Sequence, residues 1–409
     1  MDITRRKFVG ATSAALVASP MLTAARAASN SHDDPLGIRS DFPLLKTTNY
    51  LNTAYHAVSP NQVVEAGINF FKDRADPADS IGPFLAEGRV VRGKFANLVN
   101  AEQGEIGLIY TTTEAENIVV NNLGLKAGDN VVTDDLQYNA SFILYDYFAK
   151  NMGVEVRIVE RDETGRTRFE DFEKMVDNNT RIVSVSFVSH ENGLCHDLRP
   201  LSDLAHANGA YIYVDAIQGV GMVELDVKAA DIDFMGCGTY KWLLASYGTA
   251  FFYVKRELQD MIAADRRGMF AVTDMEKFRD FDPYPDAAKY GFATPAFGSV
   301  SVVGTALDYI GRIGVNNIEG HTVALAHKMR EHIVSLGLKC DTPEGNRSSV
   351  VTFYHGKSPD AVRSQYQNEN IKVTYKHGGT KIRVGASLFN NDADIDHFNA
   401  VTSEIAKLG

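Results

Sequence analysis

Apolar segments of strand length alternate with helical patterns from about Asn49 onward, and this alternation is the feature that most constrains the fold. It is typical of an α/β protein, in which helices join successive parallel strands and cover the faces of the sheet. The expected strands are Ile106–Tyr110, Asn130–Val132, Glu155–Val159, Ile182–Val188, Tyr211–Val214, Phe234–Met235 and Thr249–Val254. We therefore predict a large domain built on a mainly parallel, seven-stranded sheet.

A second, smaller α/β domain is expected at the C-terminal end. Between about 270 and 295 the periodicity is lost in a stretch that holds several prolines and aromatic residues. Two long helical patterns follow, and after them strands and helices at shorter spacing. We predict an N-terminal segment over residues 28–60, a large domain over 61–295, and a linking helix with a small domain over 296–409.

The first 27 residues have the pattern of an export signal. Arg5 and Arg6 precede a short apolar run that Pro20 interrupts, and the segment closes on Ala25-Arg26-Ala27. A basic head, a short apolar run and an A-x-A end are typical of secretory signals, and paired arginines of the twin-arginine type. The run is short for a membrane span. We expect export by the twin-arginine machinery to the periplasm or beyond, with no membrane segment in the mature protein. An amphipathic N-terminal helix and an uncleaved anchor are the alternatives.

Composition excludes several classes of function. The formal net charge of -11 argues against a nucleic-acid partner held by a basic surface. The three cysteines, Cys195, Cys237 and Cys340, show no CxxC spacing, so we expect neither a metal site nor a disulfide framework. No GxGxxG or GxxxxGK[ST] segment occurs, which argues against a nucleotide-binding α/β enzyme.

Lys241 and Asp215 carry the clearest chemical signal. Asp215 directly follows the buried strand Tyr211–Val214, where a carboxylate is costly unless a positive group faces it. Lys241 lies between Gly238 and Trp242 after another short strand, which is a poor setting for a solvated lysine. In such surroundings the pKa of a lysine falls, and the amine becomes competent for Schiff-base chemistry.

Pyridoxal phosphate needs a lysine for its aldehyde, an acid for its ring nitrogen and an anion site for its phosphate. Lys241 and Asp215 supply the first two. The third is the segment Tyr110–Asn117, where a strand turns into a helix through three threonines. Free N–H groups at a helix N-terminus, with hydroxyls beside them, bind phosphate, although the same threonines also suit an ordinary N-cap. Together the three features predict a pyridoxal-phosphate site.

Several motifs fall in an order that resembles a known family. They are Asn49–Asn52, Thr111–Asn117, Val214–Gln218 with Gly221, Tyr240–Trp242 with Gly248, and Lys381–Val384 with Asn390 and Asp394. In this order they resemble the class V aminotransferase or cysteine desulfurase-like family, whose members are fold-type I pyridoxal-phosphate enzymes. The resemblance covers almost the whole mature chain. It implies a fold-type I transferase with a large sheet domain and a smaller C-terminal α/β domain.

The resemblance also implies roles for individual residues. Lys241 is expected to form the Schiff base and to move the proton at the substrate α-carbon, and Asp215 to bind the ring nitrogen. The other cofactor contacts are expected from Thr112, Thr113 and Tyr240 at the phosphate, Tyr138 stacked on the ring, and Gln218 and His190 beside the phenolic oxygen.

Three further residues are expected at the edges of the site. Arg383 is implied to bind the substrate α-carboxylate through its fork of donors, and Asn52 to line the site. Thr294 matches a loop that reaches the phosphate of a neighbouring subunit, which makes a homodimer the expected assembly.

Each assignment has an alternative. Tyr138 also suits a tyrosine on a surface turn, His190 an ordinary loop histidine, and Asn52 a helix cap. Arg383 can instead pair with Asp392 or Asp394.

Departures from the family bear on the reaction. Cysteine desulfurases accept sulfur on a cysteine in the loop before the terminal arginine strand, whereas Val351–Arg383 holds no cysteine and reads Lys376-His377-Gly378-Gly379 there. Tyr240 stands where many desulfurases have histidine. These two departures predict that the protein is not a persulfide-forming cysteine desulfurase.

We therefore expect a pyridoxal-phosphate enzyme of the class V aminotransferase type. It would act on the amino group or α-carbon of an amino acid or a peptide-like metabolite. An isopenicillin N epimerase-like racemase and a carbon–sulfur lyase are alternatives on the same scaffold. A catalytically inactive binding protein is the alternative from a different class, but such a protein would be expected to have lost Lys241 or Asp215.

Overall fold

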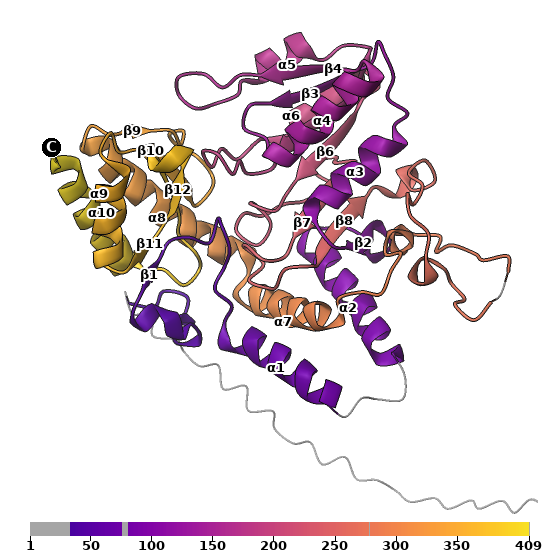
Figure 1. Cartoon of the computed structure of the whole chain (residues 1–409), viewed down its shortest axis with the longest axis horizontal. Helices are drawn as coiled ribbons and strands as arrows, with labels where there is room; N and C mark the ends of the chain where they lie inside the picture. Colours follow the sequence, from indigo (N-terminus) through magenta and orange to yellow (C-terminus); the bar gives the residue numbers. More distant parts are fainter. Residues whose placement is uncertain (1–32, 76–80, 278, 409) are drawn as a thin grey trace, which may run out of the picture.

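The computed structural model describes residues 33–75, 81–277 and 279–408 (Figure 1). The predicted export signal over residues 1–27 lies outside these ranges. Among the described residues, no helix combines the length and the apolar character that a membrane crossing requires.

The helices and strands alternate along most of the chain. The helices are α1 (Asn61–Ala75), α2 (Gly82–Leu98), α3 (Thr112–Asn122), α4 (Asn139–Met152), α5 (Phe169–Met175), α6 (Leu198–Ala207), α7 (Phe297–Ile313), α8 (Val315–Ser335), α9 (Pro359–Asn368) and α10 (Asp392–Lys407). The strands are β1 (Asn49–Tyr50), β2 (Ile106–Ile109), β3 (Asn130–Asp134), β4 (Glu155–Val159), β5 (Thr180–Ser186), β6 (Tyr211–Asp215), β7 (Phe234–Gly238), β8 (Ala250–Val254), β9 (Lys339–Cys340), β10 (Val350–Tyr354), β11 (Ile371–Lys372), β12 (Thr374–Lys376) and β13 (Lys381–Gly385).

The large sheet has seven strands in the order β2-β8-β7-β6-β5-β3-β4. The pairs from β7 through β6, β5 and β3 to β4 are parallel, and β8 is antiparallel to both of its neighbours. The predicted α/β fold with a mainly parallel sheet of seven strands is confirmed. Its central strands are buried on both faces, as their continuous apolar runs require.

The smaller unit contains a four-stranded antiparallel sheet in the order β12-β13-β10-β9. Figure 1 shows these strands grouped with α8, α9 and α10, beside the large sheet. The N-terminal strand β1 also belongs here, because it pairs in parallel with β11. Leu51, which follows β1, lies in the hydrophobic core of this unit. The boundaries given above for the two domains stay a prediction.

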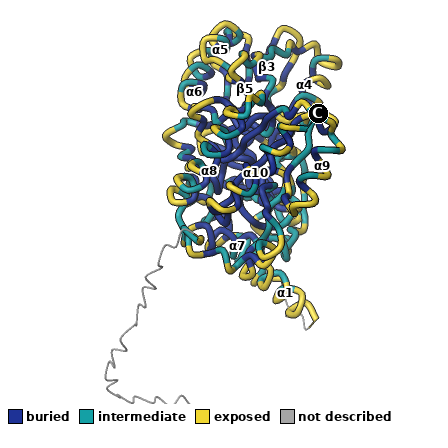
Figure 2. Tube along the Cα trace, turned by 90° about the vertical axis from the view of Figure 1, so that its left-hand side faces the viewer, coloured by how far each residue is buried: buried dark blue, intermediate teal, exposed yellow. Residues whose placement is uncertain are grey.

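Buried residues run through both units, as the dark blue parts of the tube in Figure 2 show. Local signals set several ends of elements. Gly153 ends α4 with a left-handed backbone, φ 70°, which glycine adopts without strain. Asn391 and Asp394 form a reciprocal capping box at the start of α10.

Candidate active site

A cavity of about 320 Å³ lies at the carboxyl ends of the central strands β5, β6 and β7. Open α/β sheets bind ligands at this edge, because the loops that follow the strands diverge there. The wall is made of Tyr110–Thr113, Glu116, Tyr138, Ala140, Ser141, Ser186, His190, Asp215, Ile217, Gln218, Gly238, Tyr240, Lys241 and Tyr247–Thr249. Eight of the eleven residues predicted for the site therefore lie around one cavity, and Arg383, Asn52 and Thr294 lie outside its wall.

Lys241 lies in the turn after β7 and is 8% exposed. Burial lowers the pKa of its amine to about 7; Asp215 opposes this shift and Arg383 adds to it. Its Nζ lies 5.7 Å from the centroid of the Tyr240 ring. In the described part of the chain it forms no ion pair, so a large fraction of this amine is neutral near pH 7 and able to attack a carbonyl.

Asp215 is the last residue of β6. Its Oδ1 accepts a hydrogen bond from the backbone N–H of Ile217 at 3.0 Å. Burial raises the pKa of this carboxyl, against the lowering effects of that hydrogen bond and of Lys241. A cationic N–H group placed in the cavity would stabilise the carboxylate form of Asp215.

The N-terminus of α3 opens onto the same cavity. Thr111 is the N-cap, and its Oγ1 accepts from the backbone N–H of Glu114 at 3.1 Å. The hydroxyl of Thr112 is buried and has no hydrogen-bond partner among the described residues. Gly238 lets this helix come close to β7, since a Cβ there would lie 3.1 Å from Thr112 Oγ1. The unused Thr112 hydroxyl and the free N–H groups of the first turn suit a phosphate.

Tyr138 and His190 lie next to each other at the cavity. Their ring centroids are 5.0 Å apart and the rings meet edge to face. Burial lowers the pKa of His190 to about 3, with a further contribution from Lys376 and Arg383. The imidazole is therefore neutral at physiological pH. Tyr138 is 46% exposed, which leaves its ring available to a ligand.

Gln218 is held by two hydrogen bonds. Its Nε2 donates to the carbonyl of Ala54 at 2.8 Å, and its Oε1 accepts from the indole of Trp242 at 2.9 Å. Both ends of the amide are thus fixed by protein groups, and one N–H remains for a ligand. Trp242 therefore holds the Gln218 side chain in place, a role that the sequence motif alone did not reveal.

Tyr240 stacks on Tyr247, with ring centroids 4.4 Å apart. Burial raises the pKa of Tyr240 to about 12, so its hydroxyl stays a donor.

Thr294 is exposed and lies at the edge of the site, where its carbonyl accepts a hydrogen bond from the Tyr110 hydroxyl at 3.0 Å. Its predicted contact with a neighbouring subunit stays a prediction.

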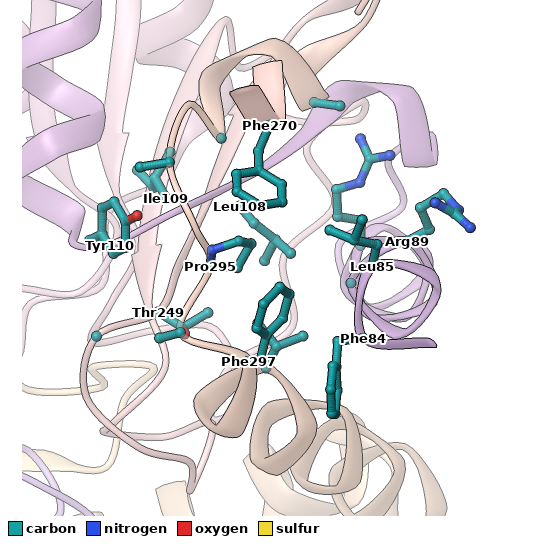
Figure 3. A pocket seen from close by; sticks show the side chains of 18 of the residues that line it. Phe84, Leu85, Arg89, Leu108, Ile109, Tyr110, Thr249, Phe270, Pro295 and Phe297 are labelled. Atoms are coloured by element: carbon teal, nitrogen blue, oxygen red, sulfur yellow. The ribbon is translucent and has the colours of Figure 1, made fainter. Parts of the chain in front are cut away.

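A second, apolar hollow of about 120 Å³ adjoins this edge and shares Tyr110, Gly248 and Thr249 with the cavity. Figure 3 shows the rings of Phe270 and Phe297 pointing into the hollow near Pro295. It therefore extends the site beyond the N-terminus of α3 with apolar rather than polar surface.

Arg383, on β13, joins the two units at the site. Its Nη1 donates to the carbonyl of His190 at 2.8 Å and its Nη2 to Thr374 Oγ1 at 3.4 Å. Its Nε is buried and has no partner in the part of the chain that the structure describes. Asn52 accepts from the same Thr374 hydroxyl, so Asn52 and Arg383 are linked through a residue that the sequence motifs did not indicate.

The alternative pairing for Arg383 is absent. Asp394 pairs with Arg39 and Asp392 with Lys328, and no ion pair joins Arg383 to either aspartate. The guanidinium is therefore free of a carboxylate partner among the described residues, as a group reserved for a substrate carboxylate needs to be.

The residues present fit pyridoxal phosphate. They offer a lysine whose pKa is lowered to about 7, a buried carboxyl group at the end of a strand, and a hydroxyl at a helix N-terminus that has no partner among the described residues, all on one cavity. These are the three groups that the cofactor needs for its aldehyde, its ring nitrogen and its phosphate.

Comparison with known families decides the assignment. The profile of the family described as aminotransferase class-V matches residues 49–395, which span the cavity and both units. The chain belongs to this family. The predicted resemblance is confirmed, and with it the expectation of pyridoxal phosphate, which is the cofactor of class V aminotransferases.

Curated relatives of this class V chain carry the name cysteine desulfurase. The probable cysteine desulfurase of Methanothermobacter thermautotrophicus is 28% identical over 396 residues, which cover 91% of this chain and 98% of the relative. The cysteine desulfurase of Escherichia coli K12 is 27% identical over 401 residues, with the same coverage.

Solved structures show the same fold. The apo cysteine desulfurase from Thermococcus onnurineus superposes with a TM-score of 0.82 at 24% identity, covering 91% of this chain and 98% of that one. The cystine C-S lyase C-DES, solved with its product cysteine persulfide, has a TM-score of 0.82 at 18% identity and covers 90% of this chain and 100% of its own.

These comparisons overturn one prediction. The absence of a cysteine from Val351–Arg383 and the tyrosine at position 240 argued against a cysteine desulfurase. That exclusion was wrong, because the curated relatives that match 91% of the chain are cysteine desulfurases. A missing thiol in one loop removes one route for the sulfur atom but does not alter the lysine, carboxylate and anion site on which bond cleavage depends. The comparisons favour the carbon–sulfur lyase alternative over the aminotransferase reading.

Proposed function

We propose that this class V protein cleaves the carbon–sulfur bond of a cysteine-type amino acid. The observation that carries the proposal is the pair Lys241 and Asp215, an amine whose pKa is lowered to about 7 and a buried carboxyl group on one cavity. The choice of substrate is supported by the cysteine desulfurases that match along almost the whole chain.

The residues divide the work of holding the cofactor. Lys241 would bind it covalently, Asp215 would accept a hydrogen bond from the ring nitrogen, and Thr112 and Thr113 with the first turn of α3 would hold the phosphate. When bound, pyridoxal phosphate supplies an electron sink that stabilises negative charge at the substrate α-carbon.

Arg383 binds the α-carboxylate of the substrate through its guanidinium and so fixes the α-carbon over the cavity. Once the amino group of the substrate has displaced it from the cofactor, Lys241 would take the proton from that carbon, since burial lowers the pKa of its free amine to about 7. The bond between the β-carbon and sulfur breaks, and its electron pair leaves with the sulfur. Because the imidazole of His190 is neutral, it adds no second positive charge that would compete with Arg383 for the substrate carboxylate.

Product analysis tests this proposal. The cofactor-loaded protein is incubated with cysteine and with cystine, and alanine, pyruvate, ammonia, sulfide and persulfide are measured, with Lys241→Ala as the control. We expect pyruvate and ammonia from the wild type, with sulfide from cysteine and cysteine persulfide from cystine, and none of these products from the variant. A keto acid formed with no loss of sulfur, together with transfer of the amino group to the cofactor, would show transamination and contradict the proposal.

We also propose that the protein is exported through the twin-arginine machinery and works as a homodimer. The paired Arg5 and Arg6 before a short apolar run support export. The resemblance of the segment Ala293-Thr294-Pro295 to a family loop that reaches a neighbouring subunit supports the homodimer. Cell fractionation of the wild type and of an Arg5→Lys/Arg6→Lys variant tests export, and light scattering after gel filtration tests the dimer. Retention of the wild type in the cytoplasm, or a monomeric mass, would contradict the respective proposal.

A further inference from the structure

Glu116 lies in the wall of the cofactor cavity, and the reaction proposed above makes no use of it. It is on α3, and only 4% of its surface is exposed. Three hydroxyls donate to its carboxyl group: Ser141 to Oε2 at 2.5 Å, and Tyr145 and Ser184 to Oε1, each at 2.8 Å. A carboxylate can accept all three hydrogen bonds, so this arrangement favours the charged form.

The charged form has no cation beside it. Among the described residues, Glu116 forms no ion pair, and the titratable groups that face it are Asp215 and Tyr213 on β6 and Tyr145 on α4. Burial outweighs the lowering effect of the three hydroxyl donors, and the charge of Asp215 adds to it, so the pKa of Glu116 is raised. The burial of two carboxylates in one wall is costly unless a positive charge joins them.

A series of hydrogen bonds links Glu116 to the strand residues at the cavity. Ser184 donates to Glu116 and accepts from Gln137 Nε2 at 3.2 Å, and Gln137 Oε1 accepts from Ser186 at 2.6 Å. Ser186 faces the cavity and pairs with Asp215 across β5 and β6. Glu116 is thus tied to the part of the cavity that Asp215 occupies, without reaching into it.

We propose that Glu116 is a positioning residue that holds a second negative charge beside Asp215 and thereby favours the protonated form of the bound cofactor. Both of its oxygens are occupied by hydroxyls, so it acts through the field of its charge rather than by contact. A unit charge acting over several ångströms of buried protein shifts a pKa by on the order of one unit. This inference rests on the pyridoxal-phosphate site and does not depend on which substrate is cleaved.

The test is a pH titration of the visible absorbance of the cofactor-loaded protein, without substrate. Glu116→Gln keeps the shape of the side chain and removes the charge. Because a negative charge stabilises the protonated cofactor, its removal is expected to move the titration midpoint to lower pH by about one unit. Glu404→Gln removes an exposed charge from the distant α10 and is expected to leave the midpoint unchanged. A role in folding alone would alter the melting temperature of Glu116→Gln and not this midpoint.

A midpoint for Glu116→Gln within about 0.2 units of the wild type, or above it, would overturn the proposal. If Glu116→Gln does not fold or bind the cofactor, Ser141→Ala provides the test. It removes one hydrogen-bond donor from the carboxylate, so the pKa of Glu116 rises. As the pH falls, the carboxylate is then protonated earlier than in the wild type. The midpoint is then expected to fall in the same direction, and an unchanged midpoint would overturn the proposal.

Discussion

The guanidinium of Arg383 donates a hydrogen bond to the carbonyl oxygen of His190 at 2.8 Å, which ties the terminal strand of the small unit to the loop after β5. Its Nε remains buried without a partner. The arginine is thus oriented before any substrate arrives, and part of its fork is still available.

Replacement of Arg383 by lysine keeps the charge but loses the fork. We expect KM for the amino acid to rise by about 10- to 100-fold, since hydrogen bonds to a charged group contribute about 1.5–3 kcal/mol. Steady-state kinetics measure this, with the absorbance of the bound cofactor as a control for the integrity of the site. An unchanged KM would show that the substrate carboxylate binds elsewhere.

The pKa of Lys241, about 7, predicts how fast the cofactor-free protein captures pyridoxal phosphate. Only the neutral amine attacks an aldehyde, so the rate should rise about tenfold per pH unit below the pKa and level off above it. The appearance of the visible band after mixing, followed from pH 5 to 10, measures this rate. A rate that still rises steeply above pH 9 would contradict the lowered pKa.

Thr112→Val removes the unpartnered hydroxyl at the N-terminus of α3 and keeps its shape. We expect the affinity for pyridoxal phosphate to fall about tenfold, as for the loss of a hydrogen bond to a charged group. Equilibrium dialysis measures it. Thr111→Ala is the matched variant: it removes the N-cap and should lower the free energy of unfolding by about 1 kcal/mol. Wild-type affinity in Thr112→Val would place the phosphate elsewhere.

Glu191 joins the loop after β5 to the small unit. It accepts from the fully buried Lys381 at 2.6 Å and also binds Lys376. Burial raises the pKa of its carboxyl, but the two lysines outweigh this and hold the pKa well below its usual range. The stability that this ion-pair network contributes is therefore present above the unfolded pKa of about 4.5 and is lost as the pH falls below it.

Glu191→Gln should lower the free energy of unfolding by about 3 kcal/mol at pH 7, because it leaves Lys376 without its carboxylate partner and leaves Lys381 paired with Asp341 alone. Urea titration measures this, and Glu404→Gln on the surface should stay within about 0.5 kcal/mol of wild type. A loss as small as that of the surface variant would show that water or Asp341 compensates for the missing charge.

Much of the fold followed from local patterns. The strands of the large sheet lie where short apolar runs end in turns, and Asp215 and Lys241 lie at the carboxyl ends of two of them because buried strands deliver side chains to one edge. How α1 packs did not follow from its sequence, since only Val63 along it is buried, whereas Val64, Ile68 and Phe71 are exposed.

Other features depend on contacts between distant segments. Nothing near β1 indicates that it pairs with β11, more than three hundred residues later. In the sequence, Glu116 looks like an acid placed near the N-terminus of its helix to complement the helix dipole. Only the fold brings Ser141, Tyr145 and Ser184 to its carboxyl group. The exclusion of a cysteine desulfurase was wrong for a related reason. The absence of a cysteine from Val351–Arg383 describes one loop, whereas the family follows from residues along the whole chain.

The most direct test of the account is the absorption spectrum of the purified protein with pyridoxal phosphate, compared with that of Lys241→Ala. The account predicts a visible band for the cofactor joined to the wild type, which survives gel filtration, and its absence or displacement in the variant. A wild-type protein that shows no such band after incubation with the cofactor, or a variant with the same band, would contradict the assignment of Lys241 as the residue that binds it.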